Sequence, residues 1–253
     1  MTTYVLLHDA FQGGWAWSRV AEILRRKRHE VYSPTLTGCG DRSHLLNQNV
    51  DLHTYVTDIT NFVHFESLSR AVFVCHGYAG MVMSAVIQAM PHVVEKAIYL
   101  DAVIPAQGKS FLDLSGEWFG YFLRSHLHGG WLVKPSIVTN DAIARQTDRQ
   151  WYESRLTSFP QAAFTAPFPG RFDSTLFDIS FIHCSRGDDP ANQNVASAAK
   201  RRKWPCHELN CGHLPMVTAP GELAGLLDTI GNKALSFPAK VAPVPLGGFR
   251  LPR

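Results

Sequence analysis

Short apolar runs alternate along the chain with longer stretches that are apolar on one side only. The apolar runs cover residues 4–7, 30–33, 71–75, 96–100, 179–184 and 205–209, and the one-sided stretches cover 17–28, 52–67, 81–90 and 220–230. The runs have the length of buried strands, and the stretches have the period of helices that pack on a sheet. Strands that alternate with helices favour a parallel sheet with helices on both faces, so the pattern predicts an α/β fold.

The alternation stops between residues 105 and 175, where large aromatic residues are frequent. We therefore expect a core formed by residues 1–104 and 176–235, with residues 105–175 inserted as a cap or lid. Many aromatic side chains in one insertion predict an apolar pocket between cap and core. Residues 236–253 are rich in proline and glycine, which is typical of an extended C-terminal extension.

Composition excludes several classes of protein. The chain of 253 residues has a formal net charge of +3, which is too weak to indicate binding to nucleic acid or to a membrane surface. Five cysteines form an odd set without a CxxC pair, and no signal peptide or long apolar span is visible, so we expect a soluble cytoplasmic protein with reduced thiols. The spacing of the histidines and cysteines predicts no metal site. The sequence contains no nucleotide-binding fingerprint, so we expect no cofactor. Whether the protein forms a homodimer is left open.

Three segments carry the candidate chemistry: LHDAFQGGWAW at residues 7–17, CHGYAG at 75–80 and NCGHLPM at 210–216. They resemble, in this order, the HGAxxGGWxW turn, the GHSYGG nucleophile elbow and the histidine loop of one branch of the α/β-hydrolase superfamily. That branch contains small esterases, carbamate hydrolases and hydroxynitrile lyases. The resemblance implies an α/β-hydrolase fold, with a mostly parallel central sheet, helices on both faces and an inserted cap.

Gly77 stands where the family carries its nucleophilic serine. The elbow turns sharply from strand to helix so that one side chain projects over the edge of the sheet. Glycine tolerates such a backbone but offers no attacking oxygen. The flanking positions also differ, because Cys75 and Ala79 replace glycines of the family motif. We therefore expect catalysis, if present, to proceed without a covalent intermediate.

The resemblance implies that His213 is the general base and that a carboxylate orients its ring. Asp101 follows the predicted strand 96–100 and keeps the chain order of elbow, acid and histidine. Asp188 and Asp189 follow the next predicted strand and form the alternative.

The backbone N–H groups of Ala10 and Tyr78 are implied by the resemblance to form an oxyanion hole. Asp9 replaces the first glycine of the family's His-Gly turn, so its carboxylate is expected to face the pocket. There Asp9 would be a useful acid if its pKa were raised. The alternative is that Asp9 points away and caps the following turn.

The other histidines, among them His8, His76, His126 and His128, are interpreted as turn or surface residues. The residues expected to contact an apolar substrate are Phe11, Trp118, Phe119, Phe122 and Trp131.

Three functions remain open at this point. The first is a non-hydrolytic enzyme, of lyase, isomerase, decarboxylase or cyclase type, that moves protons on an apolar carbonyl compound. The second is a serine hydrolase of esters, carbamates or lactones in which Gly77 replaces the nucleophile by mutation, so that Gly77→Ser would restore an acyl-enzyme. The third is a binding module that keeps the pocket but catalyses nothing.

Overall fold

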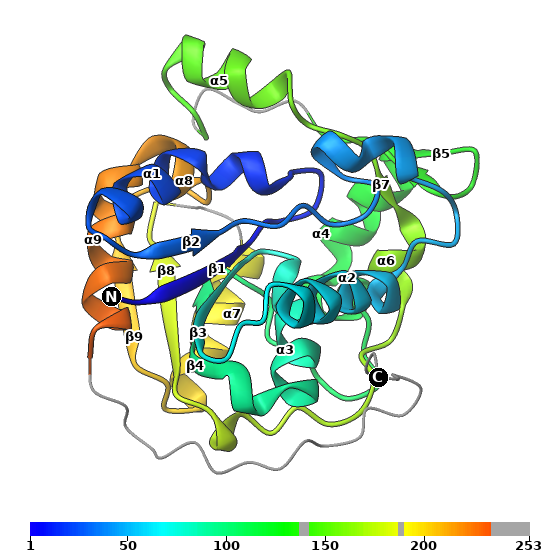
Figure 1. The fold of residues 1–253 in the computed structure, drawn as a ribbon. Helices are drawn as coiled ribbons and strands as arrows, with labels where there is room; N and C mark the ends of the chain where they lie inside the picture. Colours follow the sequence, from blue (N-terminus) through cyan, green and yellow to red (C-terminus); the bar gives the residue numbers. More distant parts are fainter. Residues whose placement is uncertain (137–141, 187–189, 234–253) are drawn as a thin grey trace.

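A parallel sheet forms the centre of the molecule. The computed structural model describes residues 1–136, 142–186 and 190–233, and within them the sheet has six strands in the order β2-β1-β3-β4-β8-β9 (Figure 1). The strands are β1 (Thr3–Leu7), β2 (Glu30–Tyr32), β3 (Ala71–His76), β4 (Val94–Leu100), β8 (Ile179–Cys184) and β9 (Cys206–Leu209). All neighbouring pairs are parallel. The predicted α/β architecture is confirmed, because each apolar run became one strand of this sheet.

Helices cover both faces of the sheet (Figure 1). Helices α1 (Ser18–Arg26), α8 (Pro215–Thr218) and α9 (Pro220–Gly231) pack on one face, and α2 (Leu52–Phe65), α3 (Ala79–Ala89) and α7 (Pro190–Arg201) on the other. Short 3-10 helices are η1 (Gly14–Trp17), η2 (Gly40–Leu45), η3 (Pro91–Val93) and η4 (Ser174–Leu176).

Alternate residues of β1 point to opposite faces of the sheet. Tyr4 and Leu6 of β1 belong to the core under α1 and α9, whereas Val5 and Leu7 belong to the core under α2 and α3. All four are fully buried because successive side chains of a strand point to opposite faces. A strand buried on both faces therefore needs the continuous apolar run that the sequence shows.

The segment between β4 and β8 contains small elements of its own. They are α4 (Phe111–His126), β5 (Leu127–His128), β6 (Leu132–Val133), α5 (Gln146–Glu153), β7 (Phe159–Pro160) and α6 (Gln161–Thr165). The three short strands form an antiparallel sheet in the order β5-β6-β7. Phe159 and Phe164 of this segment are buried against Tyr55 and Tyr78. Aromatic packing therefore holds the segment on the core, beside helices α2 and α3.

Residues of candidate chemistry follow directly after several strands. Asp9 comes after β1, Gly77 after β3 and Asp101 after β4, and His213 follows β9. The carboxyl ends of parallel strands meet at one edge of the sheet, which is where α/β proteins place their ligands. In the described residues no helix is long and apolar enough to cross a membrane. The predicted extension 236–253 and the alternative acids Asp188 and Asp189 lie outside the described residues.

Candidate active site

Gly77 lies at the sharp turn between β3 and α3. Its φ of +54° belongs to the left-handed region that side chains disfavour. A Cβ atom built on Gly77 would clash with the carboxylate carbon and with both carboxylate oxygens of Asp9. The space that a side chain at the elbow would use is therefore filled by the side chain of Asp9.

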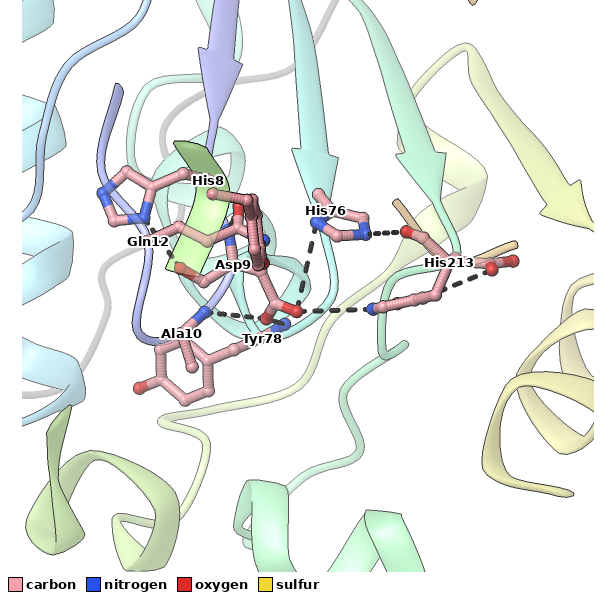
Figure 2. Close-up of polar contacts among 9 residues, drawn as sticks. His8, Asp9, Ala10, Gln12, His76, Tyr78 and His213 are labelled. Carbon is pink, nitrogen blue, oxygen red and sulfur yellow. Dashed lines mark hydrogen bonds and ion pairs between the residues drawn. The ribbon is translucent and has the colours of Figure 1, made fainter. Parts of the chain in front are cut away.

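The Asp9 carboxylate is held by two backbone donors. Its Oδ1 accepts hydrogen bonds from the N–H of Tyr78 at 2.6 Å and from the N–H of Ala10 at 2.7 Å (Figure 2). The alternative in which Asp9 points away from the pocket is therefore wrong. The expectation of an open oxyanion hole needs correction too, because these two donors are occupied by an anion of the protein itself.

His213 lies between two carboxylates. Its Nε2 is 3.4 Å from Asp9 Oδ2, and its Nδ1 is 3.3 Å from Asp101 Oδ2. Burial would lower the pKa of His213, but the hydrogen bonds and negative charges of Asp101 and Asp9 raise it to about 10. At neutral pH the ring is an imidazolium. A protonated His213 can donate a proton, whereas the resemblance implies a general base, and the role of His213 as a base stays a prediction.

Both carboxylates are ionised. Burial would raise the pKa of Asp9, but the hydrogen bond with His213, the nearby histidine charges and the N–H of Tyr78 lower it. The pKa of Asp101 is lowered in the same way against the effect of burial, by His213 and by the N–H of Cys184. A neutral Asp9, as required for the predicted acid, is not the resting form, because a cationic ring lies beside it.

Asp101 occupies a strained position at the end of β4. Its φ is +41°, which is unusual for a residue with a side chain. Its Oδ1 accepts a hydrogen bond from the N–H of Cys184 at 2.9 Å and lies 3.3 Å from His183 Nδ1, so Oδ2 is left to face His213. Backbone strain of this kind persists where surrounding contacts hold it, as the donors from β8 do here.

His8 and His76 are fully buried, which corrects their interpretation as turn or surface residues. His8 Nε2 accepts from the N–H of Leu36, so its Nδ1 carries the hydrogen that bonds the carbonyl oxygen of Asp9. His8 thereby fixes the loop that carries Asp9. His76 Nε2 lies 2.8 Å from the carbonyl oxygen of His213, and only a ring N–H can form that bond.

The second nitrogen of His76 was not anticipated from the sequence. Its Nδ1 has no hydrogen-bond partner among the described residues and lies 4.0 Å from Asp9 Oδ2 (Figure 2). Burial and the charge of His213 lower the pKa of His76 to about 4, so its ring is neutral. The position directly before Gly77 in the elbow motif is the one sequence signal that could have pointed to it.

A cavity of about 270 Å³ opens over these groups. Asp9, Gly77, Asp101 and His213 form its polar end. The remaining lining is mostly apolar and comes from Phe11, Val103, Phe111, Leu114, Ser115, Trp118, Phe119, Phe122, Ser136 and Val195.

Four of the five predicted substrate contacts, Phe11, Trp118, Phe119 and Phe122, line this cavity. Trp131 does not belong to the lining, because it sits in the tight turn between β5 and β6. Phe111, at the start of α4, is a lining residue that the prediction did not include.

Comparison with known proteins identifies the family of the chain. Residues 4–226 match the alpha/beta hydrolase family. The carbendazim hydrolyzing esterase of Nocardioides sp. (strain SG-4G) is 29% identical over 244 residues, which cover 91% of this chain and 100% of that enzyme. The putative chloroplastic methylesterase 13 of Arabidopsis thaliana is 31% identical over 120 residues, covering 46% of this chain and 27% of its own length.

Solved structures show the same fold at low identity. An extracellular alpha/beta-hydrolase from a Paenibacillus species superposes with a TM-score of 0.77 at 18% identity, covering 92% of this chain and all of the other. Tomato methylketone synthase I, complexed with 2-tridecanone, gives a TM-score of 0.73 at 16% identity, covering 91% and 98%. The chain belongs to the alpha/beta hydrolase family.

Proposed function

We propose that the protein is a non-hydrolytic enzyme that moves protons on a neutral, apolar carbonyl compound, as a lyase, isomerase or cyclase does. The observation that carries the proposal is the Asp9 carboxylate, which fills the space beside Gly77 and takes both backbone donors of the elbow. An ester carbonyl then meets neither an attacking hydroxyl nor open donors for its oxyanion.

The fit between Gly77 and Asp9 weighs against a serine hydrolase with one mutated residue. A serine at position 77 would place its Cβ on the Asp9 carboxylate. Glycine at the elbow and aspartate in the preceding loop therefore act as a pair, whereas loss of a nucleophile alone would leave an ordinary glycine at position 9. The relatives named esterases share the family, and this pair supports a different chemistry here.

The charges suit an acid–base mechanism. Asp9 Oδ2 accepts a proton from the carbon next to the substrate carbonyl, while the His213 imidazolium donates its Nε2 proton to the carbonyl oxygen, so that an enol forms. The Asp9–His213 separation of 3.4 Å is longer than a good hydrogen bond, which is usually about 2.7 to 3.2 Å, so a substrate atom competes well for either group. Asp101 stabilises the imidazolium from its other side.

The charges of the site favour a neutral substrate. Asp9 and Asp101 are anionic, His213 is cationic and His76 is neutral, so two negative charges and one positive charge leave one net negative charge. An anionic substrate is repelled in the poorly solvated cavity. Decarboxylation of a carboxylate substrate is therefore disfavoured among the reactions considered, and neutral ketones or aldehydes are favoured.

Hydrogen–deuterium exchange tests the proposal without knowledge of the natural substrate. The neutral aryl ketone 1-phenyl-2-propanone is incubated with the protein in D₂O, and loss of its benzylic proton signals is followed by NMR. We expect saturable exchange that Asp9→Asn slows at least about 100-fold, the usual range for loss of a general base. Asp41→Asn changes one exposed carboxylate away from the cavity and is expected to keep the rate within about twofold. Equal exchange in Asp9→Asn and wild type would contradict the proposal.

A further inference from the structure

Three metal-binding atoms from three distant segments meet beside the cavity, which Asp9 and His213 line, whereas His76 is fully buried and is not a lining residue. They are Asp9 Oδ2, His76 Nδ1 and His213 Nε2, and ligand atoms of these residues all lie within 4.8 Å of one another. Asp9 Oδ2 is 3.4 Å from His213 Nε2 and 4.0 Å from His76 Nδ1. The sequence predicted no metal site because motif searches depend on short spacing, and these residues are brought together only by the fold.

The atoms of these side chains that face away from the cluster are fixed by other groups. His76 Nε2 bonds the carbonyl oxygen of His213, and His213 Nδ1 faces Asp101. Asp9 Oδ1 is held by the N–H of Tyr78. Metal-binding histidines almost always donate their other ring N–H to a carbonyl or a carboxylate, which sets the tautomer and aims the free nitrogen at the ion. Both histidines here have that arrangement.

His76 Nδ1 is the unexplained atom of the site. The side chain is fully buried, and within the part of the chain that the structure describes this nitrogen has no hydrogen-bond partner. A buried polar atom without a partner is unfavourable for folding, and the proton transfer proposed above makes no use of this nitrogen. Because Nε2 carries the hydrogen, Nδ1 presents a lone pair toward Asp9, as a metal ligand does.

We propose that Asp9, His76 and His213 form a binding site for one divalent transition-metal ion such as Zn²⁺ or Co²⁺. Two imidazoles and one carboxylate suit these ions better than Mg²⁺ or Ca²⁺, which prefer oxygen ligands. Ligand atoms about 2.0 to 2.2 Å from a tetrahedral ion lie about 3.4 Å apart, so the side chains need to converge by about 1 Å. Three protein ligands leave a fourth position open toward the cavity.

The ion and the proton exclude each other at this site. A metal on His213 Nε2 replaces the hydrogen that the nitrogen otherwise shares with Asp9. The metal-bound protein is therefore expected to lose the proton transfer, while the proposal itself concerns binding and does not rest on the proposed function. Measuring binding directly keeps the two separate.

Co²⁺ absorption and Zn²⁺ calorimetry test the site. Protein dialysed against EDTA and then freed of the chelator is titrated with each ion, and we expect one ion per chain with a Kd in the micromolar range or below. His76→Gln removes the buried ligand while keeping similar volume, and we expect binding to weaken at least about tenfold. Two controls, His92→Gln and Cys206→Ser, remove exposed residues that could bind metal adventitiously and are expected to leave Kd within about twofold.

A second variant guards against misfolding of His76→Gln. Asp101→Asn leaves the three ligands in place and weakens only the orientation of His213, so we expect binding to fall about 10- to 100-fold. Circular dichroism checks that each variant is folded. Absence of binding to the wild type at millimolar ion, or unchanged affinity in both variants, would overturn the metal site. Ketone exchange measured in EDTA reports on the acid–base proposal alone.

Discussion

At the scale of single residues, the proposed chemistry depends on the pairing of Asp9 with Gly77. The Asp9 carboxylate lies where a side chain at the elbow would lie, and two backbone N–H groups bind it there. Neither residue is informative alone, because a glycine in a tight turn and an aspartate in a loop are both common. Their contact turns a site that would bind an oxyanion into one that contains a fixed anion.

The pairing predicts an energetic coupling between the two positions. Gly77→Ala adds a Cβ in the left-handed region and against the Asp9 carboxylate, so we expect the free energy of unfolding to fall by about 2 to 4 kcal/mol. Asp9→Gly removes the obstacle, and the double variant should recover about 1 to 3 kcal/mol relative to the sum of the single changes. Urea denaturation of the four proteins measures this coupling. If the two changes in unfolding free energy simply add, the Cβ at position 77 and the Asp9 side chain do not compete for the same space.

At the scale of elements, helix α4 shapes the cavity and is interrupted. Gly116 has φ +78° and ψ −175°, a conformation that only glycine adopts readily, between Phe111 and Leu114 on one side and Trp118, Phe119 and Phe122 on the other. These five residues line the cavity. The break therefore sets how the two parts of the helix present their aromatic side chains to a substrate.

Substitution of Gly116 by alanine tests this role of the break. No atom lies within 4 Å of a Cβ at Gly116, so the cost comes from the backbone alone, and we expect a loss of about 1 to 3 kcal/mol in stability. Gly221 of helix α9 has equally open space but a helical backbone, so Gly221→Ala should stabilise by about 0.4 to 1 kcal/mol. Thermal unfolding of both variants gives the comparison. A neutral or stabilising effect of Gly116→Ala would show that the backbone at Gly116 is not strained.

The elements of the core were predictable, and those of the cap were not. Strands buried on both faces appear as apolar runs, so β3 and β4 could be located to within about two residues from the apolar pattern alone. The segment between β4 and β8, which the sequence analysis expects to be a cap, instead consists of short strands, the broken helix α4 and the short helices α5 and α6. Their positions depend on tertiary contacts. Trp131 and Phe111 are both aromatic residues of this segment, and the sequence does not show which of them reaches the cavity. Trp131 lies in the turn between β5 and β6 and is not a lining residue, whereas Phe111 is.

At the scale of the whole molecule, the fold collects groups that are distant in sequence. Asp9, His76, Asp101 and His213 meet because β1, β3, β4 and β9 end at the same edge of the sheet. Sequence reasoning could point to His213 from its loop motif and to Asp9 and Asp101 from their positions after strands, with Asp188 and Asp189 left as alternative acids. It could not determine the protonation of His213, or that the N–H groups of Ala10 and Tyr78 bind the Asp9 carboxylate. Both depend on side-chain directions that the backbone of the elbow sets.

The charge arrangement predicts a pH dependence of stability. The pKa of His213 is about 10 in the folded protein and near 6.5 when unfolded, so its stabilising effect is complete below about pH 6.5 and is lost as the pH rises toward 10. Between pH 7 and 8.5 we expect the free energy of unfolding to fall by about 1 kcal/mol per pH unit or less, because the site is partly solvated.

Chemical denaturation at several pH values measures this slope against two variants. His213→Gln removes the titrating ring and is expected to abolish the decline in this range. His92→Gln removes an exposed histidine and should keep the slope. A slope that persists unchanged in His213→Gln would assign the pH dependence to other groups.

The most direct test of the account is whether an acyl group ever becomes attached to the protein within the cavity. Wild type and the Asp9→Gly/Gly77→Ser variant are mixed with 4-nitrophenyl acetate, quenched during turnover and examined by intact-mass and peptide mass spectrometry. The account predicts no acetyl group on a cavity side chain of the wild type, because Asp9 fills the elbow and occupies its donors. The double variant, with a hydroxyl and free donors, should acquire one acetyl group at position 77. An acetyl group on a cavity residue of the wild type would contradict the account.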